Sequence, residues 1–191
     1  GAGRTELLGA IFGLNPTIEV ENFLVDNQPI NIKTPKDAID NGLAFVTEDR
    51  KTEGLVLGMN IATNIGLTTL KPNSLLNEKQ ENNLAQRFIE TLRIKTPSEQ
   101  QLCVNLSGGN QQKVVLAKWL ATNPKILMLD EPTRGIDINA KNEIYELIKK
   151  LANQGKSIIV VSSEIPELLA LSDRILVMAE GRITAEFSAN E

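Results

Sequence analysis

The 191-residue chain contains no histidine. This absence excludes a Ser-His-Asp triad, a zinc site with histidine ligands and a histidine general base. A single cysteine, Cys103, cannot form a disulfide within the chain. This cysteine content fits a reducing compartment.

Long apolar runs and an excess of positive charge are also missing. No apolar run approaches the roughly 20 residues that a membrane-spanning helix needs, and the first residues lack the basic-then-apolar order of a signal peptide. The net charge of −4 gives no electrostatic case for wrapping nucleic acid. The remaining composition, 41% apolar and 23% charged, predicts a soluble globular domain or a large piece of one.

The order of predicted elements indicates an α/β fold with a mostly parallel sheet, because strands and helices alternate after residue 125. The apolar spacing predicts helices over 4–12, 35–41, 77–94, 107–122, 139–151 and 166–171. Strands are expected over 43–46, 126–129, 157–161, 175–178 and 182–187, with a small hairpin within 20–32 around Asp26-Asn27. Residues 61–122 show no strand pattern, so we expect a helical subdomain there and an α/β core formed by 1–60 and 123–191.

The stretch Leu106–Lys113, Leu-Ser-Gly-Gly-Asn-Gln-Gln-Lys, lies where the last helix of this subdomain begins. Ser107 can cap that helix, and Gly108 and Gly109 let another body approach the backbone closely. Free N–H groups at a helix N-terminus attract phosphate. An ordinary capped helix remains the alternative for this stretch taken alone.

Two adjacent carboxylates, Asp130 and Glu131, follow the apolar strand at 126–129. Carboxylates at the C-terminal end of a parallel strand lie where such sheets bind ligands. Asp130 can hold Mg²⁺, which prefers oxygen ligands, and Glu131 can polarise an attacking water molecule.

A glycine-rich segment opens the chain: Gly1, Ala2, Gly3, Arg4, Thr5, Glu6. It matches the end of a Gly-x-x-x-x-Gly-Lys-Ser/Thr phosphate loop, in which a hydroxyl binds Mg²⁺. A dinucleotide-binding Gly-x-Gly-x-x-Gly is excluded because Glu6 stands at the third glycine. The segment starts in mid-motif without an initiator Met, so we expect a piece of a longer protein whose preceding strands are not included.

Together, these motifs resemble the nucleotide-binding domain of ATP-binding cassette (ABC) transporters, a P-loop NTPase fold, over essentially the whole chain. Leu106, Ser107, Gly108, Gly109, Asn110, Gln111 and Gln112 match the family's signature motif. Residues 126–132 match its Walker B strand, and Ile136-Asp137 matches its D-loop. These three motifs in this order are highly specific.

Four further segments narrow the resemblance to the C-terminal ATPase domain of fused two-domain sugar importers of the ribose, galactose, xylose and arabinose type. They are residues 1–6, 48–59, 132–137 and 162–167. The resemblance implies that ATP and Mg²⁺ are the cofactors. Residues 1–6, Glu48, Asp130 and Ser163 would bind nucleotide, Thr5 and Asp130 would hold Mg²⁺, and Glu131 would be catalytic.

Three positions depart from the family pattern. Arg4 replaces the phosphate-loop Lys, Glu48 stands where the Q-loop carries Gln, and Ser163 stands where the switch histidine lies. An arginine fork differs in shape from a lysine point charge, and serine cannot hold a proton as histidine can. We therefore expect the chain's own ATP site to turn over slowly, while the signature residues 106–111 complete the site of a second domain.

The resemblance implies partners at the cytoplasmic face of the inner membrane. These are a second nucleotide-binding domain in the same polypeptide, permease subunits that meet the loop at 48–59, and indirectly a sugar-binding protein; nucleic acid is not expected. A regulatory or scaffolding module with decayed ATPase chemistry is the first alternative. A soluble ABC protein acting on ribosomes or DNA is the second, although the insert lacks the basic or coiled-coil character typical of that class.

Overall fold

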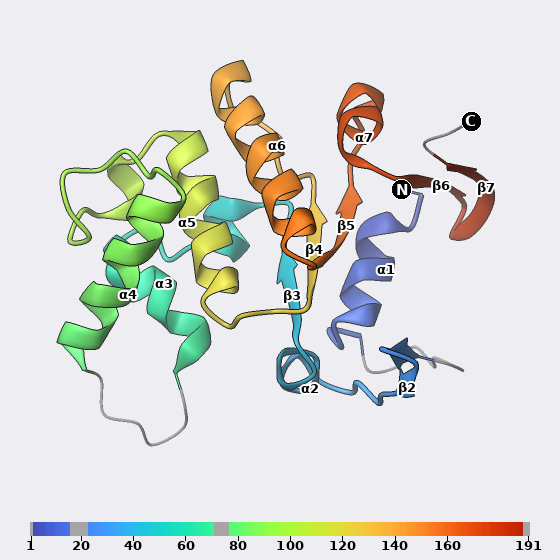
Figure 1. The fold of residues 1–191 in the computed structure, drawn as a ribbon, viewed down its shortest axis with the longest axis horizontal. Helices are drawn as coiled ribbons and strands as arrows, with labels where there is room; N and C mark the ends of the chain where they lie inside the picture. The colour runs from blue at the N-terminus through green and yellow to red at the C-terminus, as the bar shows by residue number, and fades with distance from the viewer. Residues whose placement is uncertain (1, 16–22, 71–76, 189–191) are drawn as a thin grey trace.

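The structure, a computed structural model, describes residues 2–15, 23–70 and 77–188. The described elements run along the chain in the following order, shown in Figure 1: α1 (Arg4–Ile11), β1 (Leu24–Val25), β2 (Gln28–Pro29), α2 (Pro35–Asp40), β3 (Leu43–Val46), the π-helical turn η1 (Arg50–Gly54), α3 (Ile61–Gly66), the 3-10 turn η2 (Leu67–Thr69), α4 (Glu78–Thr91), the 3-10 turn η3 (Cys103–Asn105), α5 (Gly108–Leu120), β4 (Ile126–Asp130), α6 (Ile138–Asn153), β5 (Ser157–Val161), α7 (Ile165–Leu171), β6 (Arg174–Ala179) and β7 (Arg182–Ser188).

The central sheet is parallel, with the strand order β3-β4-β5. Ala44 pairs with Leu127, and Leu127 pairs with Ile158. All three strands therefore end at the same edge, and Asp130 is the last residue of β4. The expected α/β fold with a parallel sheet is confirmed.

Helices cover both faces of this sheet (Figure 1), because successive side chains of a strand point to opposite faces. Leu43, Phe45 and Met128 pack into one apolar cluster with α1 and α2. The alternate residues of β3 and β4 pack into a second cluster with helices α3 to α6: Ala44, Val46, Leu127 and Leu129. The fully apolar strands 43–46 and 126–129 thus have the pattern expected of strands covered on both sides.

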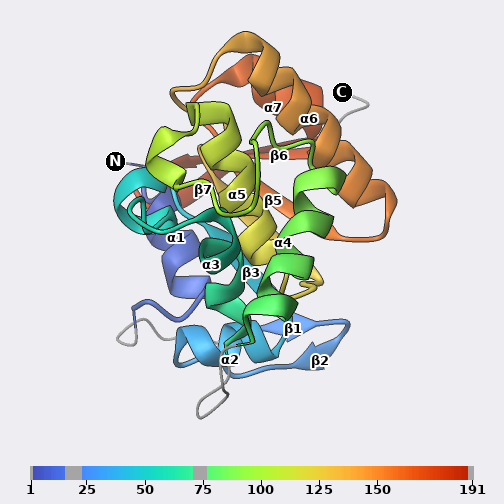
Figure 2. The ribbon, with the colours of Figure 1, turned by 90° about the vertical axis from the view of Figure 1, so that its left-hand side faces the viewer.

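Three helices, α3, α4 and α5, lie together on one side of the sheet (Figures 1 and 2). The side chains of Asn60, Asn77 and Ser107 cap their N-termini by accepting hydrogen bonds from backbone N–H groups. Because α4 carries few apolar residues, only its inner face, including Ala85 and Phe88, is buried. The division into a helical subdomain at residues 61–122 and a core of 1–60 and 123–191 stays a prediction.

The end of the chain is the antiparallel part of a fold that is expected to be mostly parallel. β6 pairs antiparallel with β7 and forms a separate two-stranded sheet. The turn between them places Glu180 and Gly181 at φ values of 51° and 74°, a conformation that closes a tight hairpin. The predicted hairpin at Asp26-Asn27 is present in its described part, 23–32, and its residues 20–22 lie outside the described residues.

No helix among the described residues is long and apolar enough to cross a membrane.

Candidate functional site

Asp130 stands at the end of β4 as a buried carboxylate. Its side chain is buried, and neither carboxylate oxygen has a hydrogen-bond partner of ordinary geometry among the described residues. Burial raises the pKa of Asp130, while the Thr5 hydroxyl and the Arg4 guanidinium partly offset that rise. An acceptor without a donor, beside a hydroxyl, suits a hard cation with oxygen ligands.

Thr5 and Arg4 reach this position because they form the first turn of α1, which begins at the strand ends. Gly3 caps the helix with a φ of 87°, which a residue with a side chain rarely adopts. The Arg4 guanidinium donates a hydrogen bond from Nη1 to the carbonyl oxygen of Ser162, 3.2 Å away. Gly1 lies outside the described residues. Ala2 accepts a hydrogen bond from the N–H of Gly181, in the turn of the last hairpin.

Glu131 follows Asp130 in a strained conformation, with a φ of 46°. Its N–H donates to the carbonyl oxygen of Val161, 2.8 Å away, which holds it at the end of β5. The Ser163 hydroxyl donates to Glu131 Oε2 over 3.2 Å. The structure thus brings together two residues that were predicted separately.

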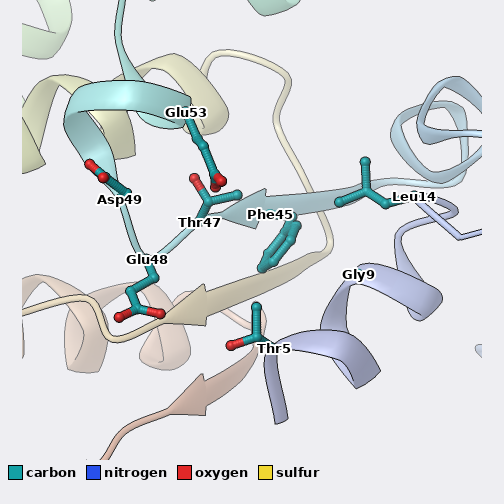
Figure 3. Close-up of a pocket in the computed structure, with 8 residues that line it drawn as sticks. All are labelled: Thr5, Gly9, Leu14, Phe45, Thr47, Glu48, Asp49 and Glu53. Atoms are coloured by element: carbon teal, nitrogen blue, oxygen red, sulfur yellow. The ribbon is translucent and has the colours of Figure 1, made fainter. Parts of the chain in front are cut away.

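Glu48 lies in the loop after β3 and forms an ion pair with Arg134, in the loop after β4. Glu48 and Thr5 also line one cavity of about 240 Å³ (Figure 3). Phe45, Leu14 and Gly9 contribute apolar surface to this cavity, and Asp49 and Glu53 contribute carboxylates. Asp130 and Glu131 do not line it, so the cavity is adjacent to the carboxylate pair rather than formed by it.

The signature residues occupy the start of α5, where Ser107 is exposed and its hydroxyl accepts from the side-chain amide of Asn110 at 2.9 Å. Gly109 is buried, and a Cβ atom added to it would lie 2.5 Å from Ala140 Cβ in α6. Gln111 donates to the carbonyl oxygen of Cys103 at 3.0 Å. Leu106 packs against the larger apolar cluster. These contacts join the stretch to α6 and to residues 93–105, not to the described part of the glycine segment.

Three residues within the segments that carry the resemblance make contacts at the site that sequence reasoning did not predict. Arg50 donates to the carbonyl oxygens of Arg134 and Gly135, and the Thr133 hydroxyl donates to the buried Glu167 at 2.7 Å. Arg50 belongs to a charged run, and nothing in the sequence separates it from an exposed arginine. Within the described residues, no group of three or more acidic, cysteine or histidine side chains could hold a metal ion by itself. A cation at Asp130 therefore needs oxygen ligands from its substrate or from water.

Comparison with known proteins identifies the family of this chain. The family described as ABC transporter matches residues 1–134. The chain belongs to the ABC transporter family.

Two relatives are similar over the full length of this ABC transporter chain. The ribose import ATP-binding protein RbsA of Rhodopirellula baltica is 54% identical over 194 residues, and the xylose import ATP-binding protein XylG of Moorella thermoacetica is 54% identical over 193. In both cases the match covers 100% of this chain and 38% of the relative. The chain thus spans well under half the length of the curated relatives it matches.

Solved structures agree on the fold of the ABC ATPases. A nucleotide-free ATP-binding cassette has a TM-score of 0.85 at 21% identity, covering 98% of this chain and 76% of the other. A dimeric cassette in a post-hydrolysis state, bound to ADP and phosphate, has a TM-score of 0.81 at 23% identity, covering 98% and 81%.

Proposed function

We propose that this chain is an ATP-binding module that energises sugar import by an ABC transporter. The observation that carries the proposal is the buried Asp130, whose unpartnered oxygens lie beside Thr5 at the start of α1. Mg²⁺ held there by Asp130 and Thr5 would neutralise charge on the phosphates of ATP. The names of the relatives, which are ribose and xylose import proteins, support sugar as the transported class.

In this proposal the residues of the chain have distinct roles. The phosphates are bound by the glycine-rich segment that opens the chain, with Glu48 and Ser163 beside them. The segment consists of Gly1, Ala2, Gly3, Arg4, Thr5 and Glu6. Glu131 accepts a proton from the attacking water, and its hydrogen bond with Ser163 orients the carboxylate. The fold division proposed for this module is a core of residues 1–60 and 123–191 with a helical subdomain at 61–122.

We further propose that this site turns ATP over slowly. The three departures from the family pattern are each engaged within the chain: Arg4 with Ser162, Glu48 with Arg134 and Ser163 with Glu131. An arginine held toward a backbone carbonyl is not free to follow a terminal phosphate as a lysine does. Serine in place of histidine supplies no charge near neutral pH.

The signature residues serve a second nucleotide-binding domain in this proposal. Ser107 is exposed at the N-terminus of the 13-residue helix α5, where free N–H groups favour phosphate. The partners of this chain in the proposal are therefore a second nucleotide-binding domain and permease subunits at the cytoplasmic face of the membrane. The second domain and the loop at 48–59 connect the chain to the permease. A sugar-binding protein would be an indirect partner.

The test uses the full-length polypeptide with its permease and compares two substitutions in this domain. Glu131→Gln should leave most ATP turnover intact, whereas Ser107→Arg should abolish most of it. Ser157→Arg, at an exposed serine that begins β5 on the opposite edge of the sheet, is the matched control. The proposal fails if Glu131→Gln abolishes turnover while Ser107→Arg leaves it unchanged.

A regulatory module without hydrolysis of its own is the second candidate, favoured by the same three engaged residues. ATP affinity and turnover separate the two: binding without any turnover at this site, in a protein whose other site is blocked, would favour the regulatory module.

A further inference from the structure

Arg50 connects two loops that are far apart in the sequence. Its Nη1 donates to the carbonyl oxygen of Arg134 at 2.8 Å, and its Nη2 donates to that of Gly135 at 3.2 Å. The planar guanidinium fork suits two neighbouring acceptors, which a single ammonium group cannot match. The loop after β3 is thereby joined to the loop after β4, which carries Glu131 and Asp137.

The same guanidinium lies against Gly108, the first residue of α5, which we call the signature helix because the signature residues lie at its start. A Cβ atom added to Gly108 would lie 2.8 Å from Arg50 Nη2 and 3.4 Å from the carbonyl oxygen of Gly135. A methyl group fits there only if the guanidinium moves, which disturbs its hydrogen bonds to the two carbonyl oxygens. Arg50 Nε is buried and has no acceptor among the described residues, so the two Nη bonds provide the polar anchoring that the structure shows. Gly108 therefore leaves room for Arg50.

The other end of η1 is fastened to the same helix. The buried Lys118 Nζ donates to the carbonyl oxygen of Gly54, and a Cβ atom on Gly54 would lie 3.0 Å from Val115 Cγ2. The π-helical turn from Arg50 to Gly54 thus runs along α5 and is attached near both of its own ends.

We propose that Arg50 is a positioning residue that fixes the start of the signature helix relative to the loop after β4. Ser107 and Gly108 are thereby held in one arrangement with the segment that runs from Glu131 to Asp137. This inference rests on the proposed function, because a fixed start of α5 matters for turnover only if the signature stretch serves a nucleotide. Arg50 touches neither nucleotide nor water in this role and acts through Gly108 and the two carbonyl groups.

The first experiment is a double-mutant cycle in the full-length polypeptide, measured by thermal unfolding without nucleotide. Gly108→Ala should lower the unfolding midpoint when Arg50 is present, and should lower it by less than half as much in the Arg50→Ala background. The control cycle uses Gly58→Ala in place of Gly108→Ala, because a Cβ atom at Gly58 would meet only open space. Gly58→Ala should give the same shift in both backgrounds. Equal shifts for Gly108→Ala in both backgrounds would overturn the proposal.

The second experiment measures ATP turnover of the full-length protein with its permease. Arg50→Lys keeps the charge but loses the fork, so kcat should fall about 10-fold or more with KM changed by less than about twofold. Lys150→Ala, at an exposed residue in the last turn of α6 and outside the loop at 48–59, is the control and should retain turnover. Full turnover in Arg50→Lys would contradict the positioning role. The unfolding cycle needs no ATP, so it tests Arg50 even if Ser107→Arg shows that the signature stretch serves no nucleotide.

Discussion

At the scale of single residues, the buried carboxylate of Asp130 lowers the stability of the folded chain but suits the proposed Mg²⁺ site. A buried acceptor without a donor costs about 1–3 kcal/mol, and more when charged. We therefore expect Asp130→Asn to stabilise the protein without nucleotide by about 1 kcal/mol at neutral pH, because the cost of the buried charge is removed while that of a buried polar group remains. Stabilisation by Mg²⁺-ATP should be lost in the same variant. Thermal unfolding with and without Mg²⁺-ATP measures both effects.

The pH dependence of this difference follows from the direction of the pKa shift. Burial raises the pKa of Asp130 above its ordinary value of 3.8, so the folded state binds a proton that the unfolded state has released. Its contribution to stability is present below 3.8 and is lost as the pH rises through the folded-state pKa. The advantage of Asp130→Asn should thus grow with pH over that window and then stay constant. An advantage that shrinks as the pH rises would contradict this account.

The buried thiol of Cys103, in the turn η3 that precedes α5, provides a probe of how readily the structure opens. Burial raises the pKa of its thiol from 9.0 to about 11, which lowers its thiolate fraction roughly 100-fold in the folded protein. We expect an aromatic disulfide reagent at pH 8 to label this chain only as fast as it opens or unfolds. Absorbance at increasing urea concentration measures the rate, with Cys103→Ser as the control. Rapid labelling without urea would show that the thiol is accessible.

At the scale of elements, the contact between α5 and α6 depends on one missing side chain. A Cβ atom at Gly109 would lie 2.5 Å from Ala140 Cβ, and neither atom can rotate away. Gly109→Ala should therefore destabilise the protein by about 1–3 kcal/mol. Ala140→Gly in the same chain should recover part of that loss, less the roughly 1 kcal/mol that glycine costs within a helix. Urea unfolding of the four proteins gives the coupling, and additive effects would exclude this contact.

The elements themselves could largely be predicted from the sequence, because each depends on neighbours along the chain. The runs at 43–46 and 126–129 are apolar throughout, and the Asp26-Asn27 turn is marked by residues that tolerate positive φ. The turn at Glu180-Gly181 between the last two strands is also recognisable in the sequence, but the separation of β6 from the central sheet is not, since its apolar pattern fits a parallel strand equally well. This turn returns the chain onto β6.

The candidate site divides in the same way. Asp130 and Glu131 were predictable because the end of a parallel strand is recognisable in a sequence. The hydrogen bond between Ser163 and Glu131, and the fork of Arg50 on residues 134 and 135, join positions 32 and 84–85 residues apart. Such contacts depend on how loops from different strands meet at one edge, and no local pattern encodes them.

At the scale of the whole molecule, the proposed function assigns two tasks to two separate places in the chain. The edge formed by Asp130, Glu131 and the first turn of α1 holds the groups that we propose bind phosphate. The start of α5 presents Ser107 away from them and is fixed by Arg50 and Ala140. In the proposed function, one place binds nucleotide and the other completes the site of a second domain, so loss of turnover at the first need not remove the second.

Restoring the family residues tests this separation directly. Arg4→Lys, Glu48→Gln and Ser163→His together would replace each engaged side chain by one suited to a terminal phosphate, a neutral amide contact and a chargeable group. The measurement uses a full-length polypeptide whose other nucleotide-binding domain cannot hydrolyse ATP. There we expect the triple variant to turn over ATP about 10- to 100-fold faster than the same polypeptide with Arg4, Glu48 and Ser163 unaltered. Adding Glu131→Gln to the triple variant should remove that gain, because the gain depends on a carboxylate that accepts a proton. If the triple variant gains nothing while its affinity for ATP rises, the slow turnover does not arise from these three side chains, and the regulatory reading becomes the better one.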